Sequence, residues 1–279
     1  SRVANHPYRH TRRIMPEQPW WEHLESSFHK FPDDFELDWR TELTVDGTAV
    51  GDYLLRTAGA GMLSSLALPS SMKPGQLKQD LANMACYKTR ASAADPTRLF
   101  RRPASSRVEM RSSSAGFFRF RPEDGSCELL SFASPFQTVN PKLRERYPRH
   151  KRNMRAVAQY WQHNSGPRPT ICVIHGFMAD PYWLNRMFFA LPWFYAQGYD
   201  ILLYTLPHHG RRQARLSPFS GHGLFASGLS HLNESMAHAV HDFRIFMDYL
   251  ESRGVNRIGV TGISLGGYTS ALLAAVEDR

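Results

Sequence analysis

Short apolar runs alternate with helical stretches through the C-terminal part of the chain. Residues 170–174, 200–204 and 257–261 form continuous apolar runs, which are typical of strands buried on both faces. Helices are predicted after each of these strands, at residues 181–197, 233–253 and 264–276. Gly198 and Gly254 follow the first two helices, where C-terminal caps are common. This alternation predicts parallel βαβ units with right-handed crossovers.

Antiparallel strands are predicted upstream of these units. Three candidate strands lie at residues 106–111, 116–121 and 128–133. Residues 122–125 (Pro-Glu-Asp-Gly) form a strong turn signal between two of them. A basic helical connector is then predicted at residues 141–163. The expected fold class is α/β, with a mostly parallel sheet, antiparallel N-terminal strands and helices on both faces.

Residues 1–105 contain no chemical motif. Helical spacing is visible there in three places, at Trp20, Trp21, Leu24 and Phe28, at residues 53–66 and at residues 76–87. We therefore interpret residues 1–105 as an N-terminal extension, mainly helical or irregular, that packs against a main domain at residues 106–279.

The composition excludes a wholly disordered chain and gives no sign of a membrane span. Of the 279 residues, 42% are hydrophobic and 12% aromatic, which is enough to bury a core. No apolar run reaches the length of a transmembrane helix, and no signal peptide is visible. The three cysteines, Cys86, Cys127 and Cys172, form no CxxC pair, so neither a disulfide framework nor a zinc site is expected. This cysteine pattern favours a reducing compartment, and we expect a cytoplasmic location.

The net charge of +9 raises the possibility of an anionic partner. The basic residues are scattered, and we find no helix-turn-helix, zinc-finger or RNA-binding signature, so no specific nucleic-acid partner is expected. The densest basic stretch, residues 144–155, is either an anion-binding patch or the solvated face of the connector. We favour the solvated face.

One pentapeptide has the pattern of a nucleophile elbow. Gly262-Ile263-Ser264-Leu265-Gly266 follows a predicted strand directly and precedes a predicted helix. An elbow is a strained turn, and Gly262 and Gly266 are small enough to let the strand and helix backbones pass closely. Ser264 is therefore the candidate catalytic nucleophile. The alternative is a packing turn in which Ser264 is only an N-cap.

A second motif follows the first apolar strand. His175-Gly176-Phe177 begins as that strand ends, and Gly176 permits a sharp exit. We expect the backbone N–H groups of Phe177 and Leu265 to form an oxyanion hole, each contributing about 3 kcal/mol to transition-state stabilisation. His175 is interpreted as structural. Four nearby residues either line an acyl pocket or are ordinary core, namely Phe177, Met178, Tyr182 and Trp183.

The order of these motifs resembles that of the α/β-hydrolase superfamily, within a poorly characterised branch similar to serine esterases and lipases. Residues 206–211 (Leu-Pro-His-His-Gly-Arg) resemble the loop that follows another strand of that fold, with Thr205 and His208 departing from the usual Asp and Gly. The resemblance implies hydrolysis of a small acyl ester through an acyl-enzyme at Ser264, without cofactor or metal. It also implies an acid and a histidine that follow the nucleophile in the chain.

No histidine follows Ser264 in residues 265–279, so we expect this sequence to be a fragment, C-terminally truncated and inactive by itself. Four upstream histidines, His208, His209, His222 and His231, are alternative bases. His238 and His241 are spaced for a metal but lack a third ligand, so we interpret them as helix-surface residues. Acyl transfer at the same elbow and a catalytically silent binding module are the alternative functions.

Overall fold

The computed structural model describes residues 38–71, 74–91, 95–105, 108–115 and 119–278. The chain divides into two compact units, Ser1–Gly61 and Met62–Arg279. Helix α1 (Trp39–Ser71) begins in the first unit and contains the helix predicted at residues 53–66. The helix predicted around Trp20 and Phe28 lies outside the described residues. No helix of the described ranges has the length and apolarity needed to cross a bilayer.

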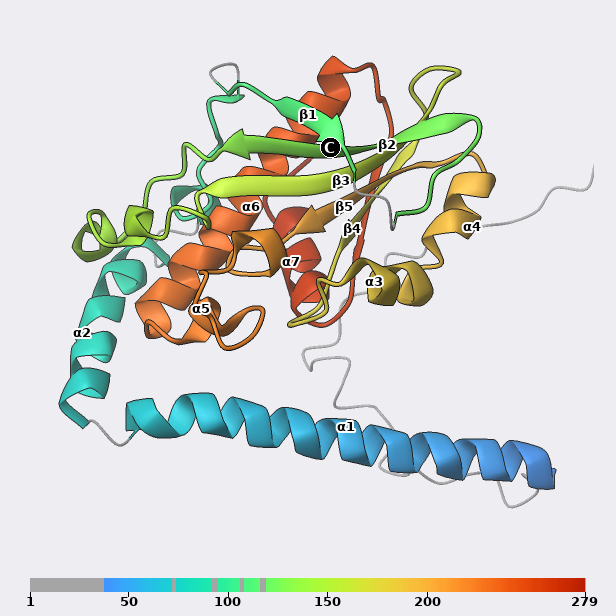
Figure 1. The fold of residues 1–279 in the computed structure, drawn as a ribbon. Coiled ribbons are helices and arrows are strands. Elements are labelled where there is room, and N and C mark those ends of the chain that lie inside the picture. The colour runs from blue at the N-terminus through green and yellow to red at the C-terminus, as the bar shows by residue number, and fades with distance from the viewer. Residues whose placement is uncertain (1–37, 72–73, 92–94, 106–107, 116–118, 279) are drawn as a thin grey trace, which may run out of the picture. The chain divides into compact units, whose positions relative to one another are not determined.

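The second unit is built on one six-stranded sheet (Figure 1). The strands are β1 (Arg111–Ser114), β2 (Gly125–Ala133), β3 (Arg155–His163), β4 (Thr170–Ile174), β5 (Asp200–Thr205) and β6 (Ile258–Gly262). Their order in the sheet is β1-β2-β3-β5-β4-β6. The pairs β1–β2, β2–β3 and β3–β5 are antiparallel, whereas β4 pairs in parallel with both β5 and β6. The sheet is therefore mixed, and the three strands predicted to be parallel are parallel.

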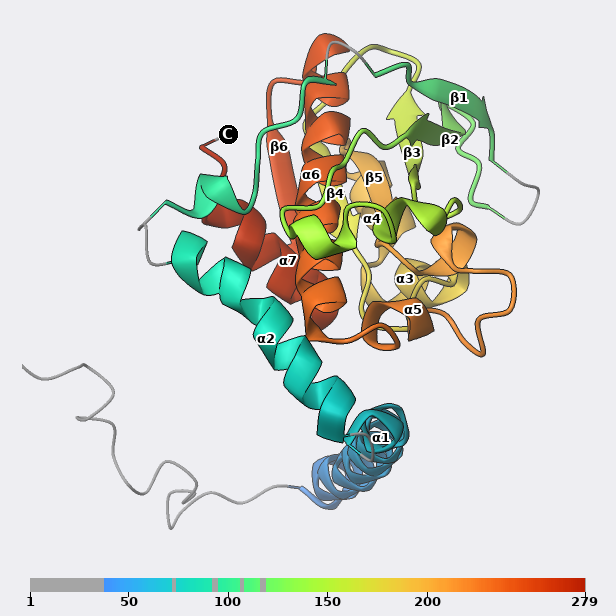
Figure 2. The ribbon, with the colours of Figure 1, turned by 90° about the vertical axis from the view of Figure 1, so that its left-hand side faces the viewer.

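Helices cover both faces of this sheet, as the sequence predicts. They are α2 (Pro74–Ala91), α3 (Tyr182–Phe188), α4 (Leu191–Ala196), α5 (His222–Phe225), α6 (Leu229–Ser252) and α7 (Leu265–Ala274). Figure 2 shows α2, α6 and α7 together on one side of the sheet. Helices α3 and α4 pack on the opposite side, against β5 and its neighbours.

Alternate residues of β5 contribute to two separate cores. Leu202 and Tyr204 pack on the α6 side with Phe243 and Phe246. Ile201 and Leu203 face the α3–α4 side, together with Trp161 and Tyr182. Because both faces are covered, β4 and β5 show no alternation of apolar and polar residues. Burial of each of these side chains is worth about 1.5–3 kcal/mol.

The predicted helical connector at residues 141–163 is wrong. Two 3₁₀ turns, Pro141–Leu143 and Tyr147–Arg149, precede strand β3, which occupies Arg155–His163. β3 pairs with β2 on one side and β5 on the other, and nearly every residue of it is buried. Burial on both faces removes the period of two that would have identified a strand.

Other element boundaries also differ from the prediction. Of the strand expected at 106–111, only Arg111 lies in β1, residues 108–110 are not in a strand, and residues 106–107 lie outside the described ranges. Residues 119–121 are also not in a strand. Residues 116–118 of that second candidate lie outside the described ranges. The helix expected at 181–197 breaks into α3 and α4 at Ala190, whose φ of 44° is left-handed.

Strand β6 is buried on one face only, which corrects the expectation of a third fully buried strand. Gly259 and Thr261 are exposed, while the alternate residues Ile258, Val260 and Gly262 are half-buried. Among the described strands β6 has one partner, β4, and it forms one edge of the sheet.

Candidate active site

Ser264 occupies a strained turn between β6 and α7. Its backbone has φ 54° and ψ −117°, a conformation that L-residues rarely adopt and that costs about 1–3 kcal/mol. The residue is exposed, and no described side chain forms a hydrogen bond with its hydroxyl. The turn therefore presents the Ser264 hydroxyl to solvent at the carboxyl end of the strand.

The two glycines that flank this turn are required by close backbone contacts. A Cβ added to Gly262 would overlap the backbone of Gly266, where α7 begins. A Cβ added to Gly266 would overlap the carbonyl oxygen of Ile174 at the end of β4. Strand β4, the turn and helix α7 thus meet without room for a side chain at either glycine. The sequence analysis proposes close backbone approach as the reason for these glycines.

Two backbone amides lie at the same end of the sheet without hydrogen-bond partners. The Leu265 N–H is at the first position of α7, where the helix dipole favours negative charge. The Phe177 N–H follows Gly176, and a Cβ on Gly176 would lie 3.5 Å from the Cβ of Ser264. Neither amide donates a hydrogen bond to another described residue.

These features coincide at one edge of the sheet. β4, β5 and β6 run in parallel and end there, and the strained serine leaves the last of them for a helix. An antiparallel series, β1–β2–β3, continues the sheet beyond β5. The chain has an α/β-hydrolase-like fold.

No known protein-family model matches the chain, and no curated protein matches its sequence. Solved structures do match it at low identity. A cold-adapted esterase from an Arctic intertidal metagenomic library is 16% identical with a TM-score of 0.39, over 60% of this chain and 62% of that one. Acetyl xylan esterase 1 from Thermoanaerobacterium sp. is 20% identical with a TM-score of 0.34, over 61% and 48%. Candida antarctica lipase A is 14% identical with a TM-score of 0.34, over 63% and 40%. The chain spans about half the length of these structures.

His175 has no nitrogen available for base catalysis in this α/β-hydrolase-like fold. Its Nδ1 lies 2.8 Å from the carbonyl oxygen of Gly176, and its Nε2 accepts a hydrogen bond of 3.1 Å from the Leu206 N–H. Burial lowers the pKa of the imidazole, which is 1% exposed. The ring therefore ties the exit of β4 to the exit of β5, as the structural interpretation expects.

The loop histidines considered as alternative bases make other contacts, and none of them forms a hydrogen bond with Ser264. His208 and His231 face each other, with 3.1 Å between their Nε2 atoms, and both are buried. The Nδ1 of His209 lies 2.8 Å from the carbonyl oxygen of Pro207, while its Nε2 is buried without a partner against Gly221 and Phe177. His222 is half-buried and packs on Phe219, with no hydrogen bond to Ser264.

The interpretation of His238 and His241 as helix-surface residues is wrong. Both are buried in α6, where His238 stacks on Phe136 with ring centroids 4.5 Å apart. The Nε2 of His238 lies 2.9 Å from Asp242, and its Nδ1 lies 3.0 Å from the hydroxyl of Tyr147. No group of three His, Cys, Asp or Glu residues in the described ranges could hold a metal ion.

Arg212 was not identified from the sequence, yet it organises the loop that follows β5. Its guanidinium is fully buried and donates to Asp242, to the carbonyl oxygens of Asn153 and Thr205, and to the hydroxyl of Tyr204. This loop carries His208 and His209, so Arg212 fixes the strand end next to the candidate site. The partners of Arg212 lie up to 59 positions away in the sequence, so a spacing pattern does not identify this network.

The residues considered for an acyl pocket fall into three environments. Tyr182 belongs to the α3–α4 core and Trp183 is 65% exposed. The ring of Phe177 packs edge-on against Phe225 at 5.1 Å, beside the candidate oxyanion amides, and Met178 follows it with a φ of 59°. Asp180, just before α3, accepts a hydrogen bond from the hydroxyl of Ser220.

Proposed function

We propose that the protein hydrolyses carboxylic esters through an acyl-enzyme at Ser264. The observation that carries the proposal is the strained, exposed conformation of Ser264, with φ 54°, at the strand-to-helix turn. Strain of this kind is retained where a side chain must be presented in one orientation. The hydroxyl oxygen attacks the carbonyl carbon, the alcohol leaves, and water then hydrolyses the acyl-enzyme.

The Phe177 and Leu265 amides are assigned to the oxyanion. Neither N–H group has an acceptor among the residues that the structure describes, and Gly176 brings the exit of β4 against the side chain of Ser264. The negative charge on the carbonyl oxygen develops only during attack, so donors fixed in advance stabilise the transition state more than the substrate.

The base and the acid are assigned to residues outside 1–279. In support, His175 has both ring nitrogens engaged, His208 and His231 contact each other, and His209 is fully buried. The exposed face and free edge of β6 leave space beside the site for further chain. On this proposal residues 1–279 have no esterase activity by themselves. Sequencing the source transcript past Arg279 tests the assignment, and a stop codon there would contradict it.

The activity test uses the longest chain that the gene encodes. Hydrolysis of p-nitrophenyl acetate and butyrate is compared between the unchanged protein, Ser264→Ala and Ser252→Ala. We expect kcat/KM to fall by on the order of 10³-fold or more in Ser264→Ala, because the nucleophile is lost. Ser252→Ala, an exposed serine at the far end of α6, is the matched control and should leave the rate unchanged. Equal rates in the two variants would exclude Ser264 as the nucleophile.

A further inference from the structure

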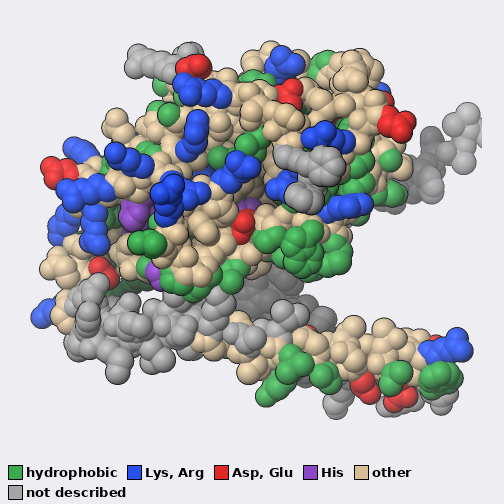
Figure 3. Space-filling model, viewed as in Figure 1, with side chains coloured by type: hydrophobic (Ala, Val, Ile, Leu, Met, Phe, Trp, Pro, Cys, Tyr) green, Lys and Arg blue, Asp and Glu red, His purple; other side chains and the backbone are tan. Residues whose placement is uncertain are grey.

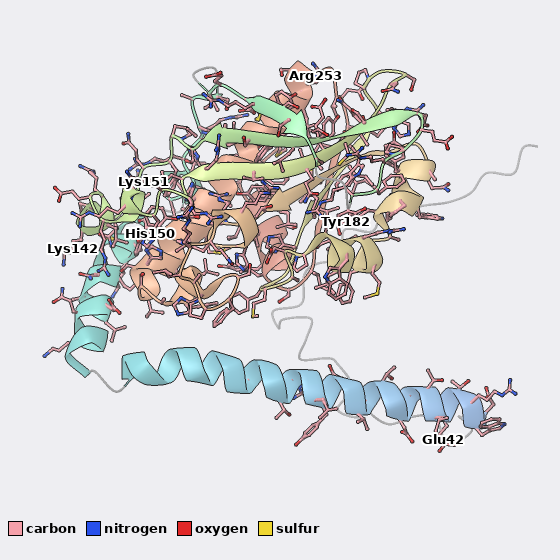
Figure 4. The ribbon with its side chains drawn as sticks, in the orientation of Figure 1. Glu42, Lys142, His150, Lys151, Tyr182 and Arg253 are labelled. Atoms are coloured by element: carbon pink, nitrogen blue, oxygen red, sulfur yellow. The ribbon has the colours of Figure 1, made fainter. Side chains whose placement is uncertain are left out.

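A basic hollow of about 520 Å³ lies on the face of the sheet opposite α6. Its walls are Lys151, Arg152, Arg155 and Arg211, and its floor contains Ser113, Leu129, Ser131 and Val157. Figure 3 shows Lys and Arg side chains gathered on this side of the molecule, and Figure 4 labels Lys151 just before β3 begins.

Strand register explains the floor of the hollow. Ser131 pairs with Val157, and Ser113 pairs with Leu129, so these residues point to the same face. Their chain neighbours Ala156 and Leu130 point into the core on the α6 side. The floor is therefore part apolar and part hydroxyl, and β2 and β3 hold it rigidly.

The walls carry four positive charges and no negative one. Among the described residues no Asp or Glu lines the hollow, and none of the four cations makes an ion pair there. Arg119 adds a fifth charge nearby, where burial and the proximity of Arg211 lower the pKa of its guanidinium. Like charges gathered on a concave wall repel each other and focus a positive potential into the hollow.

The hollow lies at the same end of the sheet as Ser264. Val157, in its floor, pairs with Thr205 at the carboxyl end of β5, and Arg211 belongs to the loop that follows. β3 and β6 are three strand spacings apart, or about 14 Å across the sheet.

We propose that this hollow binds a small molecule that carries phosphate groups. Guanidinium groups match phosphate oxygens in pairs, and three arginines, a lysine and two serine hydroxyls offer more donors than one carboxylate can accept. The volume is in the range of small-molecule pockets, about 300–1,000 Å³, and its concave shape suits a soluble ligand better than a membrane surface. The site does not depend on catalysis at Ser264. On this proposal, part of the basic stretch 144–155 is an anion-binding patch and not only a solvated face, because Lys151, Arg152 and Arg155 line the hollow.

The test measures binding of inorganic pyrophosphate to the 279-residue chain by titration calorimetry at constant ionic strength. The variant Arg152→Gln/Arg155→Gln removes two lining charges, and we expect it to weaken binding about tenfold or more. The control Arg144→Gln/Arg149→Gln removes two exposed charges from the same stretch outside the hollow, so the net charge is identical. The control should change affinity by less than twofold, because screened long-range attraction is all that it loses.

A second pair of variants tests the proposal if the first lining variant fails to fold. Arg211→Gln should weaken pyrophosphate binding severalfold, whereas Arg215→Gln, an exposed arginine outside the hollow, should not. Fructose 1,6-bisphosphate should compete with pyrophosphate, and malonate should compete much more weakly. The proposal is overturned if pyrophosphate does not bind, if lining and control variants weaken binding equally, or if malonate binds as tightly. Binding to anionic lipid vesicles without binding to soluble phosphates would also overturn it.

Discussion

The guanidinium of Arg212 and the carboxylate of Asp242 meet with 2.7 Å between Nη2 and Oδ2, and both side chains are fully buried. Arg212 lies in the loop that follows β5, at the end of a 3₁₀ turn (Gly210–Arg212), and Asp242 lies in the middle of α6. Although burial by itself raises the pKa of Asp242, the adjacent His238 and Arg212 hold it below its ordinary value. The pair therefore stays ionised and fixes the loop at the carboxyl end of β5.

Replacement of Arg212 by Met should strongly destabilise the fold. It leaves the Asp242 carboxylate buried without its ion-pair partner, and we expect a loss of about 3–5 kcal/mol in the free energy of unfolding. Urea unfolding measures the loss, with Arg215→Met as the exposed control, expected within about 0.5 kcal/mol of the unchanged chain. Arg212→Met/Asp242→Leu should lose less than the sum of its single variants, because no charge is then buried alone. Additive losses would show that the two groups do not interact.

This pair also marks a limit of sequence analysis. Arg212 and Asp242 are 30 positions apart, and neither stands in a motif. His238 and His241 show the same limit, since polar residues within a helix suggest an exposed face. His238 can be buried because Arg212, Tyr147 and Asp242 supply hydrogen-bond partners from several segments, and the Nδ1 of His241 lies 3.5 Å from Asp242.

The strand-to-helix turn at Ser264 could be predicted because its requirements are local. Gly262, Ser264 and Gly266 lie within five consecutive residues, and their chemistry is fixed by one turn between a strand and a helix. Strand β3 could not be predicted, because burial on both faces removed its alternation and its partners β2 and β5 come from other parts of the chain. Local geometry is readable from sequence, whereas pairing across long separations is not.

Alanine at Gly266 should destabilise the fold, whereas alanine at the nearby Gly259 should not, because only Gly266 is in close backbone contact. Gly266→Ala places a Cβ against the Ile174 carbonyl oxygen, and backbone cannot give way as a flexible side chain does. We expect a loss of about 1–3 kcal/mol or more in the free energy of unfolding. Gly259→Ala, on the exposed face of β6 with nothing within 4 Å, is the control and should be neutral or slightly stabilising. The prediction fails if the two variants unfold at the same denaturant concentration.

The buried histidines should make the fold lose stability as the pH falls below 6.5. Burial lowers the pKa of His209 and of His231 to about 3, and that of His238 to about 4. Between pH 6.5 and 4 the unfolded chain binds protons at these residues while the folded chain does not. The free energy of unfolding therefore falls with falling pH, by up to about 1.4 kcal/mol per pH unit for each histidine. The lowered pKa of Asp242 acts only below about 3.8, outside this window.

A single variant tests the assignment of this slope. His209→Gln removes one titrating ring, whose Nε2 has no hydrogen-bond partner to lose. The free energy of unfolding is measured in urea at several pH values between 7.5 and 5. The slope of this free energy against pH should correspond to about one fewer proton taken up on unfolding than in the unchanged chain. An unchanged slope would mean that His209 does not titrate on unfolding in this range.

The strain at Ser264 makes a prediction about stability that does not involve substrate. Ser264→Gly allows the backbone to keep φ 54° without a Cβ, whereas Ser264→Ala retains the Cβ and its strain. We expect Ser264→Gly to be more stable than Ser264→Ala by about 1 kcal/mol in urea unfolding. Ser270, inside α7, provides the matched control, because glycine within a helix costs about 1 kcal/mol relative to alanine. The order of the Gly and Ala variants should therefore reverse between the two serines. If glycine is the less stable substitution at both positions, the turn at Ser264 stores no strain, and the observation that carries the esterase proposal is lost.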